Sequence, residues 1–254
     1  MVIWSNKVIR NLIFILVFLI SANSLHSQDI RIINNYNYRK VNKLLEKYID
    51  SETLITWNKI VKDYNFRIHN ISKSNYTTNI DLIKNTASLN LQGRYFNCRM
   101  NAFLLIKSNI IEFNFMDNTI DPFTEVEVNN YEKYGIKLNE SDKYIYQMLF
   151  STIYLSDTTN SIDILKQKYE KLKIKESSIN ILIVNEVYSN AIAVTHVALV
   201  IENDDETISI IEKLSPFDPF VRVKIKKNNV FDYYKELLSS KGHIVISIGN
   251  EILW

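Results

Sequence analysis

The chain has few of the residues that usually cross-link or interrupt a polypeptide. Its 254 residues include one cysteine, four glycines and three prolines. One cysteine cannot form a disulfide within the chain, which leaves three interpretations: an inert buried thiol, a bond to another chain, or a reactive thiol. Because glycine and proline are so scarce, turns must be predicted from asparagine, aspartate and serine.

The chain also lacks a strong charge of either sign. Its formal net charge is +2 at pH 7, with 46% apolar and 23% charged residues. This balance gives no electrostatic argument for a nucleic-acid partner, and the apolar content is typical of a globular chain. His69, His196 and His243 stand in no metal-ligand spacing, so we predict neither a metal site nor another cofactor.

The N-terminus has the three-part pattern of a secretory signal peptide. Lys7 and Arg10 precede an unbroken apolar run from Leu12 to Ile20, and a small polar stretch continues to Gln28. The run is shorter than the roughly 20 residues that span a bilayer, although an uncleaved membrane anchor remains the alternative. We therefore predict a signal peptide over residues 1–27 and a periplasmic or secreted mature protein that has no membrane partner.

The mature chain, residues 28–254, changes its pattern near its middle. Apolar residues at helical spacing predict helices over residues 38–50, 51–64, 80–90, 98–106, 141–155 and 160–174. Short β-branched runs then predict strands over residues 179–188, 194–202, 207–214 and 220–226, followed by a helix over 229–239 and a strand over 243–249. Residues 29–37 are predicted as a polar leader and 110–130 as mixed structure. Helices followed by a mostly antiparallel sheet predict one α+β domain, with residues 28–90 as a helical N-terminal extension.

Cys98 falls at the first turn of the predicted helix over residues 98–106. Asn97 is a favourable N-cap residue, and a helix N-terminus carries a partial positive charge that stabilises a thiolate. Arg99 adds positive charge, unless it is solvated or paired with a buried carboxylate. The alternative for Cys98 is a small buried thiol on an apolar helix. Export of the chain, the helix start and the partners considered next favour a nucleophile.

A nucleophilic cysteine needs a base, and the base needs an orienting group. His196 lies in one predicted strand, and Glu212 lies among apolar residues in the strand that returns after the next turn. A hairpin centred on Asp204 would place His196 directly opposite Glu212, with Cβ atoms about 5 Å apart, whereas a slip of one residue would separate them. We predict Cys98, His196 and Glu212 as nucleophile, base and orienting group. The alternatives are a histidine bonded to backbone and a glutamate that is partly exposed or paired with a lysine.

Acyl transfer also needs hydrogen-bond donors for the oxyanion. Gln92, which Gly93 follows, could supply its side-chain amide, and the backbone N–H of Cys98 could supply the second donor. The alternative for Gln92 is a plain loop amide. Asn97 and Arg99 flank the thiol and are predicted to bind substrate.

A cysteine at a helix N-terminus, then a histidine on a strand, then a polar residue on the next strand resembles the papain-like thiol hydrolase superfamily. That group includes cysteine peptidases and the NlpC-type bacterial cell-wall amidases. Gln92 and Gly93 before Cys98 are similar to the oxyanion-hole spacing of the papain peptidases. Two departures stand out: Phe96-Asn97 precede the cysteine and Arg99 follows it, where papain enzymes have Gly-Ser and an aromatic residue, and Glu212 stands where papain has asparagine.

The stretches NCRMNAFLL and THVALVIE…IEKLSPFDPF also resemble an uncharacterised family of exported bacterial domains of unknown function, over about residues 35–250. Together the resemblances imply a papain-like fold and a cysteine peptidase or amidase. The implied substrates are peptides or peptidoglycan-like molecules. A non-catalytic exported binding or structural domain with a hydrolase-like fold is the alternative, and a thiol acyltransferase would use the same residues.

Overall fold

The computed structural model describes residues 29–68, 80–91, 95–115, 121–156, 160–175, 178–238 and 243–253. The predicted signal peptide, His69 and Gln92 lie outside the described residues. Within the described ranges, no helix is both long and apolar enough to cross a membrane.

The helices begin mostly where capping residues predict them. They are α2 (Tyr38–Leu45), α3 (Ser51–Arg67), α5 (Ile80–Asn90), α6 (Cys98–Ile106), α7 (Pro122–Glu132), α8 (Glu140–Phe150), α9 (Ser161–Tyr169) and α10 (Val230–Leu238). In α3, α6, α7, α8 and α9 the side chain of an aspartate or asparagine N-cap accepts a hydrogen bond from a backbone N–H of the first turn. Such caps satisfy donors that a helix start leaves without a partner.

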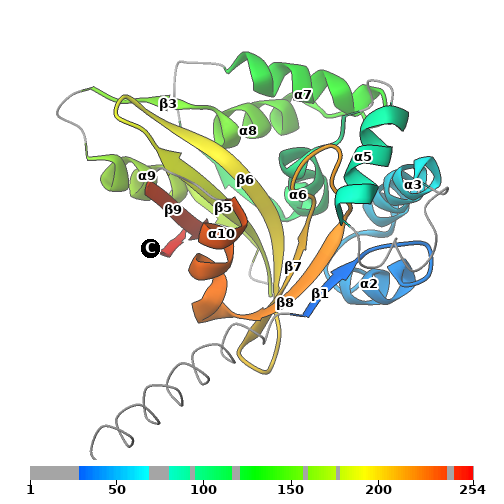
Figure 1. The fold of residues 1–254 in the computed structure, drawn as a ribbon. Coiled ribbons are helices and arrows are strands. Elements are labelled where there is room, and N and C mark those ends of the chain that lie inside the picture. Colours follow the sequence, from blue (N-terminus) through cyan, green and yellow to red (C-terminus); the bar gives the residue numbers. More distant parts are fainter. Residues whose placement is uncertain are drawn as a thin grey trace, which may run out of the picture.

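The strands form one large sheet and one small one. They are β1 (Asp29–Ile32), β2 (Ile110–Phe113), β3 (Ile153–Tyr154), β4 (Leu172–Ile174), β5 (Ile179–Val187), β6 (Ala191–Glu202), β7 (Thr207–Glu212), β8 (Val221–Lys226), β9 (His243–Ile248) and β10 (Glu251–Leu253). The large sheet has the order β1-β8-β7-β6-β5-β9-β10, with β3 on β6, and its pairs are antiparallel. Helices from the N-terminal half pack on this mostly C-terminal sheet (Figure 1), so the predicted α+β class is confirmed.

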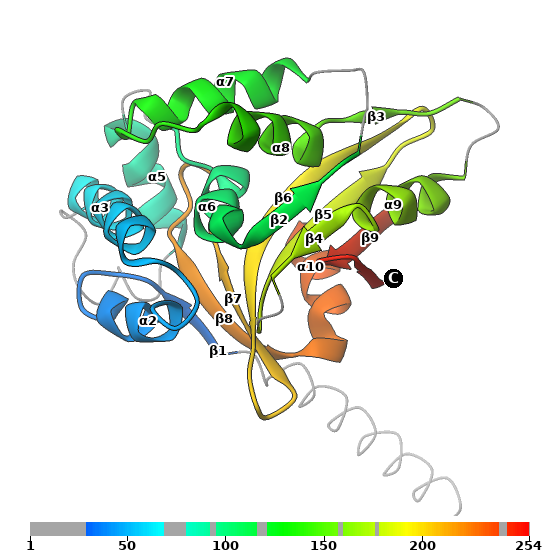
Figure 2. The same ribbon diagram turned by 180° about the vertical axis from the view of Figure 1, so that it is seen from behind.

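Helix α6 occupies the centre of the helical layer. Figure 2 shows it against β6 and β7, with α3 and α5 to one side and α7 and α8 above it. Its residues from Met100 to Ile106 are all buried, which is the pattern expected of a helix surrounded by protein. One hydrophobic core joins α6 to the sheet and to the helices around it. The core therefore fixes the position of the turn that carries Cys98.

Four sequence predictions were wrong at the level of local structure. The helix predicted over 141–155 ends at Phe150, and Ile153–Tyr154 form β3, which pairs with β6. Residues 29–37 contain β1, which extends the sheet by pairing with β8. Within residues 110–130, the strand-like start forms β2 as predicted, but the loop predicted around Asp121 and Pro122 is the start of α7, with Asp121 as its N-cap and Pro122 at its first position. The helix predicted over 160–174 ends at Tyr169, and the next residues form β4, which pairs with β2. The strands form by pairing with residues far along the chain, whereas α7 begins at a local Asp121-Pro122 start signal that the prediction overlooked.

One edge of β6 is only partly covered by neighbouring strands. Strand β5 pairs with the other edge from Ile192 to Ile201. The edge opposite β5 pairs with β3 at residues 191–192 and with β7 at residues 199–202. Between these two stretches, residues 193–198 have no partner strand on that edge among the described residues. His196 lies in this gap, where backbone groups along the uncovered edge of β6 are not used by a neighbouring strand.

Candidate active site

Cys98 is the first residue of α6, as the sequence predicts. Asn97 has extended backbone angles, φ −101° and ψ −171°, and its Oδ1 accepts a hydrogen bond from the Met100 N–H at 3.0 Å. The Cys98 side chain is buried, with the residue 7% exposed. A buried thiol at a capped helix start lies in the positive end of the helix dipole, which favours its thiolate form.

Replacing Asn97 with alanine should destabilise the protein and weaken the thiolate together. Loss of a side-chain cap lowers the free energy of unfolding by about 1 kcal/mol, and a frayed first turn raises the pKa of Cys98. Urea unfolding and the pH dependence of alkylation measure the two effects. Asn139→Ala is the matched control, because Asn139 caps α8 through the Asp142 N–H at 2.7 Å. It should cost similar stability and leave the Cys98 pKa unchanged; an equal pKa change in both variants would contradict the prediction.

His196 and Glu212 are in direct contact. His196 Nε2 lies 2.8 Å from Glu212 Oε2, and the two side chains are 1% and 0% exposed. The predicted register is wrong by two residues: Leu199 pairs with Ile211, and extending that register puts Ala198 opposite Glu212. A shift of two residues keeps both side chains on one face, and long side chains on one face reach such diagonal neighbours. The predicted contact therefore forms from a different register.

The second ring nitrogen of His196 is left for Cys98. Nδ1 is buried and has no aligned hydrogen-bond partner among the described residues, yet the thiol and the imidazole interact closely enough to shift each other's pKa. Catalytic hydrogen bonds are often loosely aligned before substrate binds. One imidazole nitrogen on a carboxylate and the other beside a thiol is the arrangement that activates a nucleophilic cysteine.

The electrostatics favour a thiolate–imidazolium pair. Burial would raise the pKa of Cys98, but the hydrogen bond and charge of His196, the charge of Arg99 and a hydrogen bond from the Val197 backbone outweigh it and lower that pKa. Burial would likewise lower the pKa of His196, and the interactions with Cys98 and Glu212 raise it above its ordinary value. Val197 lies in the uncovered stretch of β6, where no strand among the described residues takes the backbone group that bonds Cys98.

Glu212 accepts three hydrogen bonds and stays ionised. Besides His196, Tyr233 donates to Oε1 at 2.6 Å and Tyr234 donates to Oε2 at 2.8 Å. Burial alone would raise the pKa of Glu212, whereas His196 and the two tyrosines lower it below its ordinary value. Donors aimed at a carboxylate stabilise its charged form, so this buried group can support a protonated imidazole.

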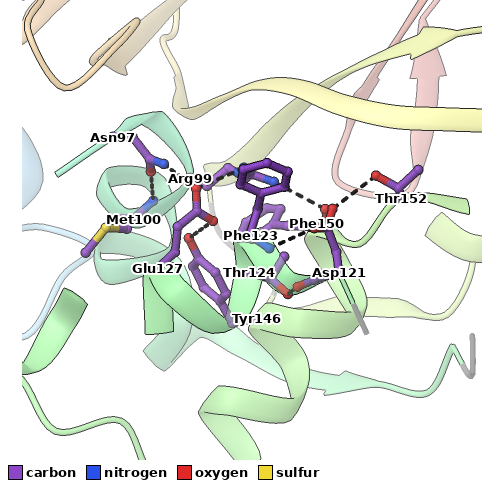
Figure 3. A network of polar contacts seen from close by, with 10 residues as sticks. All are labelled: Asn97, Arg99, Met100, Asp121, Phe123, Thr124, Glu127, Tyr146, Phe150 and Thr152. Carbon is purple, nitrogen blue, oxygen red and sulfur yellow. Dashed lines mark hydrogen bonds and ion pairs between the residues drawn. The ribbon is translucent and has the colours of Figure 1, made fainter. Parts of the chain in front are cut away.

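A second polar cluster joins the start of α6 to α7 (Figure 3). Arg99 pairs with Glu127 at 2.9 Å and also contacts the Phe150 carbonyl at 3.5 Å. Asn97 Nδ2 donates to Glu127 Oε1, and the Tyr146 hydroxyl lies 2.9 Å from Glu127 Oε2. Asn97 and Arg99 thus anchor the start of α6 to α7. Their polar groups are largely engaged within the protein, and substrate binding by these two residues stays a prediction.

Lys213 is a buried lysine that sequence reasoning missed. It is 1% exposed, its Nζ lies 3.8 Å from the ring centroid of Tyr64 and 4.7 Å from that of Phe220, and it donates to the Asp218 carbonyl. Burial lowers its pKa, and the charges of Asp218 and Cys98 oppose that change. The charge of Cys98 thus acts on Lys213 as well as on His196.

Six site residues were predicted. The structure brings Cys98, His196 and Glu212 together and sets Asn97 and Arg99 beside them. The sixth, Gln92, lies outside the described residues. Sequence reasoning missed Glu127, Tyr233 and Tyr234. Tyr233 and Tyr234 fit the ordinary pattern of an amphipathic helix, so nothing in the sequence indicated that they contact Glu212. Within the described ranges, no group of three histidine, cysteine, aspartate or glutamate side chains could hold a metal ion.

The chain belongs to a family described as "Domain of unknown function (DUF4300)", whose pattern matches residues 29–241. The match begins at β1 and ends just before β9, so it includes both Cys98 and the hairpin that carries His196 and Glu212. No significant match was found among curated proteins or among solved structures.

Proposed function

We propose that this member of the family is an exported, papain-like cysteine hydrolase that cleaves an amide or peptide bond. The observation that supports it most is the contact of His196 Nε2 with Glu212 Oε2 at 2.8 Å, which leaves Nδ1 for the thiol of Cys98 at the start of α6. Nucleophile, base and orienting group in this order are the parts that acyl transfer to cysteine requires.

The reaction would proceed in two steps. The Cys98 thiolate attacks the carbonyl carbon, and the backbone N–H of Cys98 stabilises the oxyanion. His196 transfers its proton to the leaving amine as the C–N bond breaks, which leaves an acyl-enzyme. A water molecule then attacks the thioester while His196 accepts its proton, which releases the acid and restores the Cys98 thiolate beside a protonated His196. Gln92 remains a proposed second oxyanion donor.

Peptides or peptidoglycan-like molecules are the substrates proposed for this reaction, because they are the amides abundant outside the cytoplasm. The proposed periplasmic or secreted location rests on the pattern of residues 1–27. A thiol acyltransferase would form the same acyl-enzyme and pass the acyl group to an amine instead of water.

The test is the pH dependence of Cys98 alkylation by iodoacetamide in the folded protein. Because Cys98 is the chain's one cysteine, the label reports on a single site. The half-maximal rate should fall well below pH 8.5, the ordinary cysteine value. His196→Ala should move the midpoint toward 8.5 and lower the rate at pH 6 by at least about tenfold, since each pH unit changes the thiolate fraction about tenfold.

His243→Ala is the matched control, because His243 is exposed at the start of β9 and should leave the profile unchanged. The midpoint, not the absolute rate, decides the test, since a 7% exposed thiol also reacts slowly for reasons of access. A thiol that alkylates only after unfolding would overturn the proposed enzyme. That result would favour a non-catalytic exported domain.

A further inference from the structure

We propose that Tyr233 and Tyr234 are positioning residues, which hold the Glu212 carboxylate in place on His196 and keep it from taking up a proton. The inference deepens the proposed function and rests on it. It assigns to α10 a part of the site that neither the thiol nor the histidine strand supplies.

The contacts that carry this inference are all made by buried side chains. Tyr233 is 5% exposed and Tyr234 is 0% exposed, and their hydroxyls reach different oxygens of Glu212, at 2.6 and 2.8 Å. Burial, followed by the charge of Glu212, raises the pKa of both tyrosines. Their hydroxyls therefore stay protonated and donate to the carboxylate.

Tyr234 also restrains the imidazole itself. Its ring centroid lies 5.3 Å from that of His196, with the planes tilted by 40°, and 4.9 Å from that of Tyr233. The same residue thus contacts the base through its ring and the orienting carboxylate through its hydroxyl. Two neighbouring residues of one helix fix both the carboxylate and the ring that it orients.

The groups facing Glu212 define what its protonation would do. They are His196 from β6 and the two tyrosines from α10, with Cys98 from α6 behind the imidazole. Lys213, the next residue along the chain, donates a hydrogen bond to the Asp218 carbonyl and lies over the ring of Tyr64. With the tyrosine donors removed, Glu212 would become protonated at a higher pH. Its carboxyl O–H would then donate a hydrogen bond to His196 Nε2. The imidazole would then carry its own proton on Nδ1 and could not accept the one from Cys98.

The experiment compares alkylation profiles of the full chain with Tyr233→Phe, Tyr234→Phe and the double substitution. The acid midpoint of the profile should rise by about one pH unit in each single variant, and further in the double variant, because hydrogen bonds to a carboxylate favour its charged form. Tyr169→Phe is the matched control: Tyr169 is 0% exposed and donates to Asn185 Oδ1 at 2.8 Å. It loses a buried hydrogen bond that does not involve Glu212, and it should keep the original midpoint.

Circular dichroism establishes which variants fold, and Tyr233→Phe alone decides the test if Tyr234→Phe does not fold. A low midpoint in the unsubstituted protein that stays unchanged in the tyrosine variants would overturn this inference and leave the proposed hydrolase standing. An ordinary thiol midpoint in the unsubstituted protein would instead overturn the proposed function. A rise as large in Tyr169→Phe would also overturn the inference, because it would reflect general loosening.

Discussion

Replacing Glu212 with alanine should lower the free energy of unfolding by about 3–5 kcal/mol, the usual cost of removing one partner of a buried ion pair. Glu212 is 0% exposed and accepts from His196, Tyr233 and Tyr234. The alanine variant leaves three buried donors without their acceptor, and buried polar groups without partners are costly. The same change also removes the counter-charge that supports a protonated His196.

Urea unfolding at pH 7 measures this effect. A carboxyl whose pKa is lowered in the folded state contributes stability above its unfolded value of about 4.3 and loses it as the pH falls through the folded value. At pH 7 the contribution of Glu212 is therefore fully present. Glu202→Ala is the control: Glu202 is 51% exposed in its side chain and pairs with Lys227 at 3.6 Å. It should cost less than about 1 kcal/mol, and a similarly small cost for Glu212→Ala would contradict the prediction.

The start of α6 was predictable because its signals are local. Asparagine before a run of apolar residues predicts a capped helix, and Asn97 makes the expected contact with the Met100 N–H at 3.0 Å. The contact between His196 and Glu212 was predictable for a more general reason. A carboxylate among apolar strand residues needs a partner, and an even shift in register keeps two side chains on the same face.

Other features depend on contacts that no local pattern encodes. Strand β1 has only four residues, and its structure comes from pairing with β8, far along the chain. The gap along β6 exists because β3 and β7 each cover only one end of that edge. Glu127 lies in α7, a helix that was not predicted from the sequence. Its partners Asn97 and Arg99 come from the start of α6, about 30 residues earlier in the chain. These features follow from tertiary packing, which overrides local preference.

Replacing Trp57 with alanine should lower the free energy of unfolding by about 3–5 kcal/mol, as large-to-small changes of buried aromatic residues do. Trp57 is 0% exposed in α3, and its ring centroid lies 6.1 Å from that of the buried Phe220. Its Nε1 donates to Asn101 Oδ1 in α6 at 2.9 Å. The substitution therefore opens a cavity and also removes a polar link between α3 and the helix that carries Cys98.

Two further variants separate the cavity from the hydrogen bond. Asn101 is 0% exposed, and its Nδ2 already has no hydrogen-bond partner among the described residues. In Trp57→Phe, Asn101 Oδ1 would also lose its donor, the indole N–H. This loss should lower the free energy of unfolding by about 1–3 kcal/mol. Adding Asn101→Leu should recover most of that loss, because replacing both polar partners with apolar groups is nearly neutral.

Urea unfolding measures this series, with Ile55→Ala as the control from the same helix. Ile55 is 55% exposed, so its truncation should change stability by less than about 0.5 kcal/mol. The alkylation midpoint of Cys98 should stay unchanged in Trp57→Phe, because Asn97 and the bonds to Glu127 fix the first turn of α6 independently of Asn101. A midpoint that follows stability through the whole series would show instead that the docking of α3 sets the thiolate.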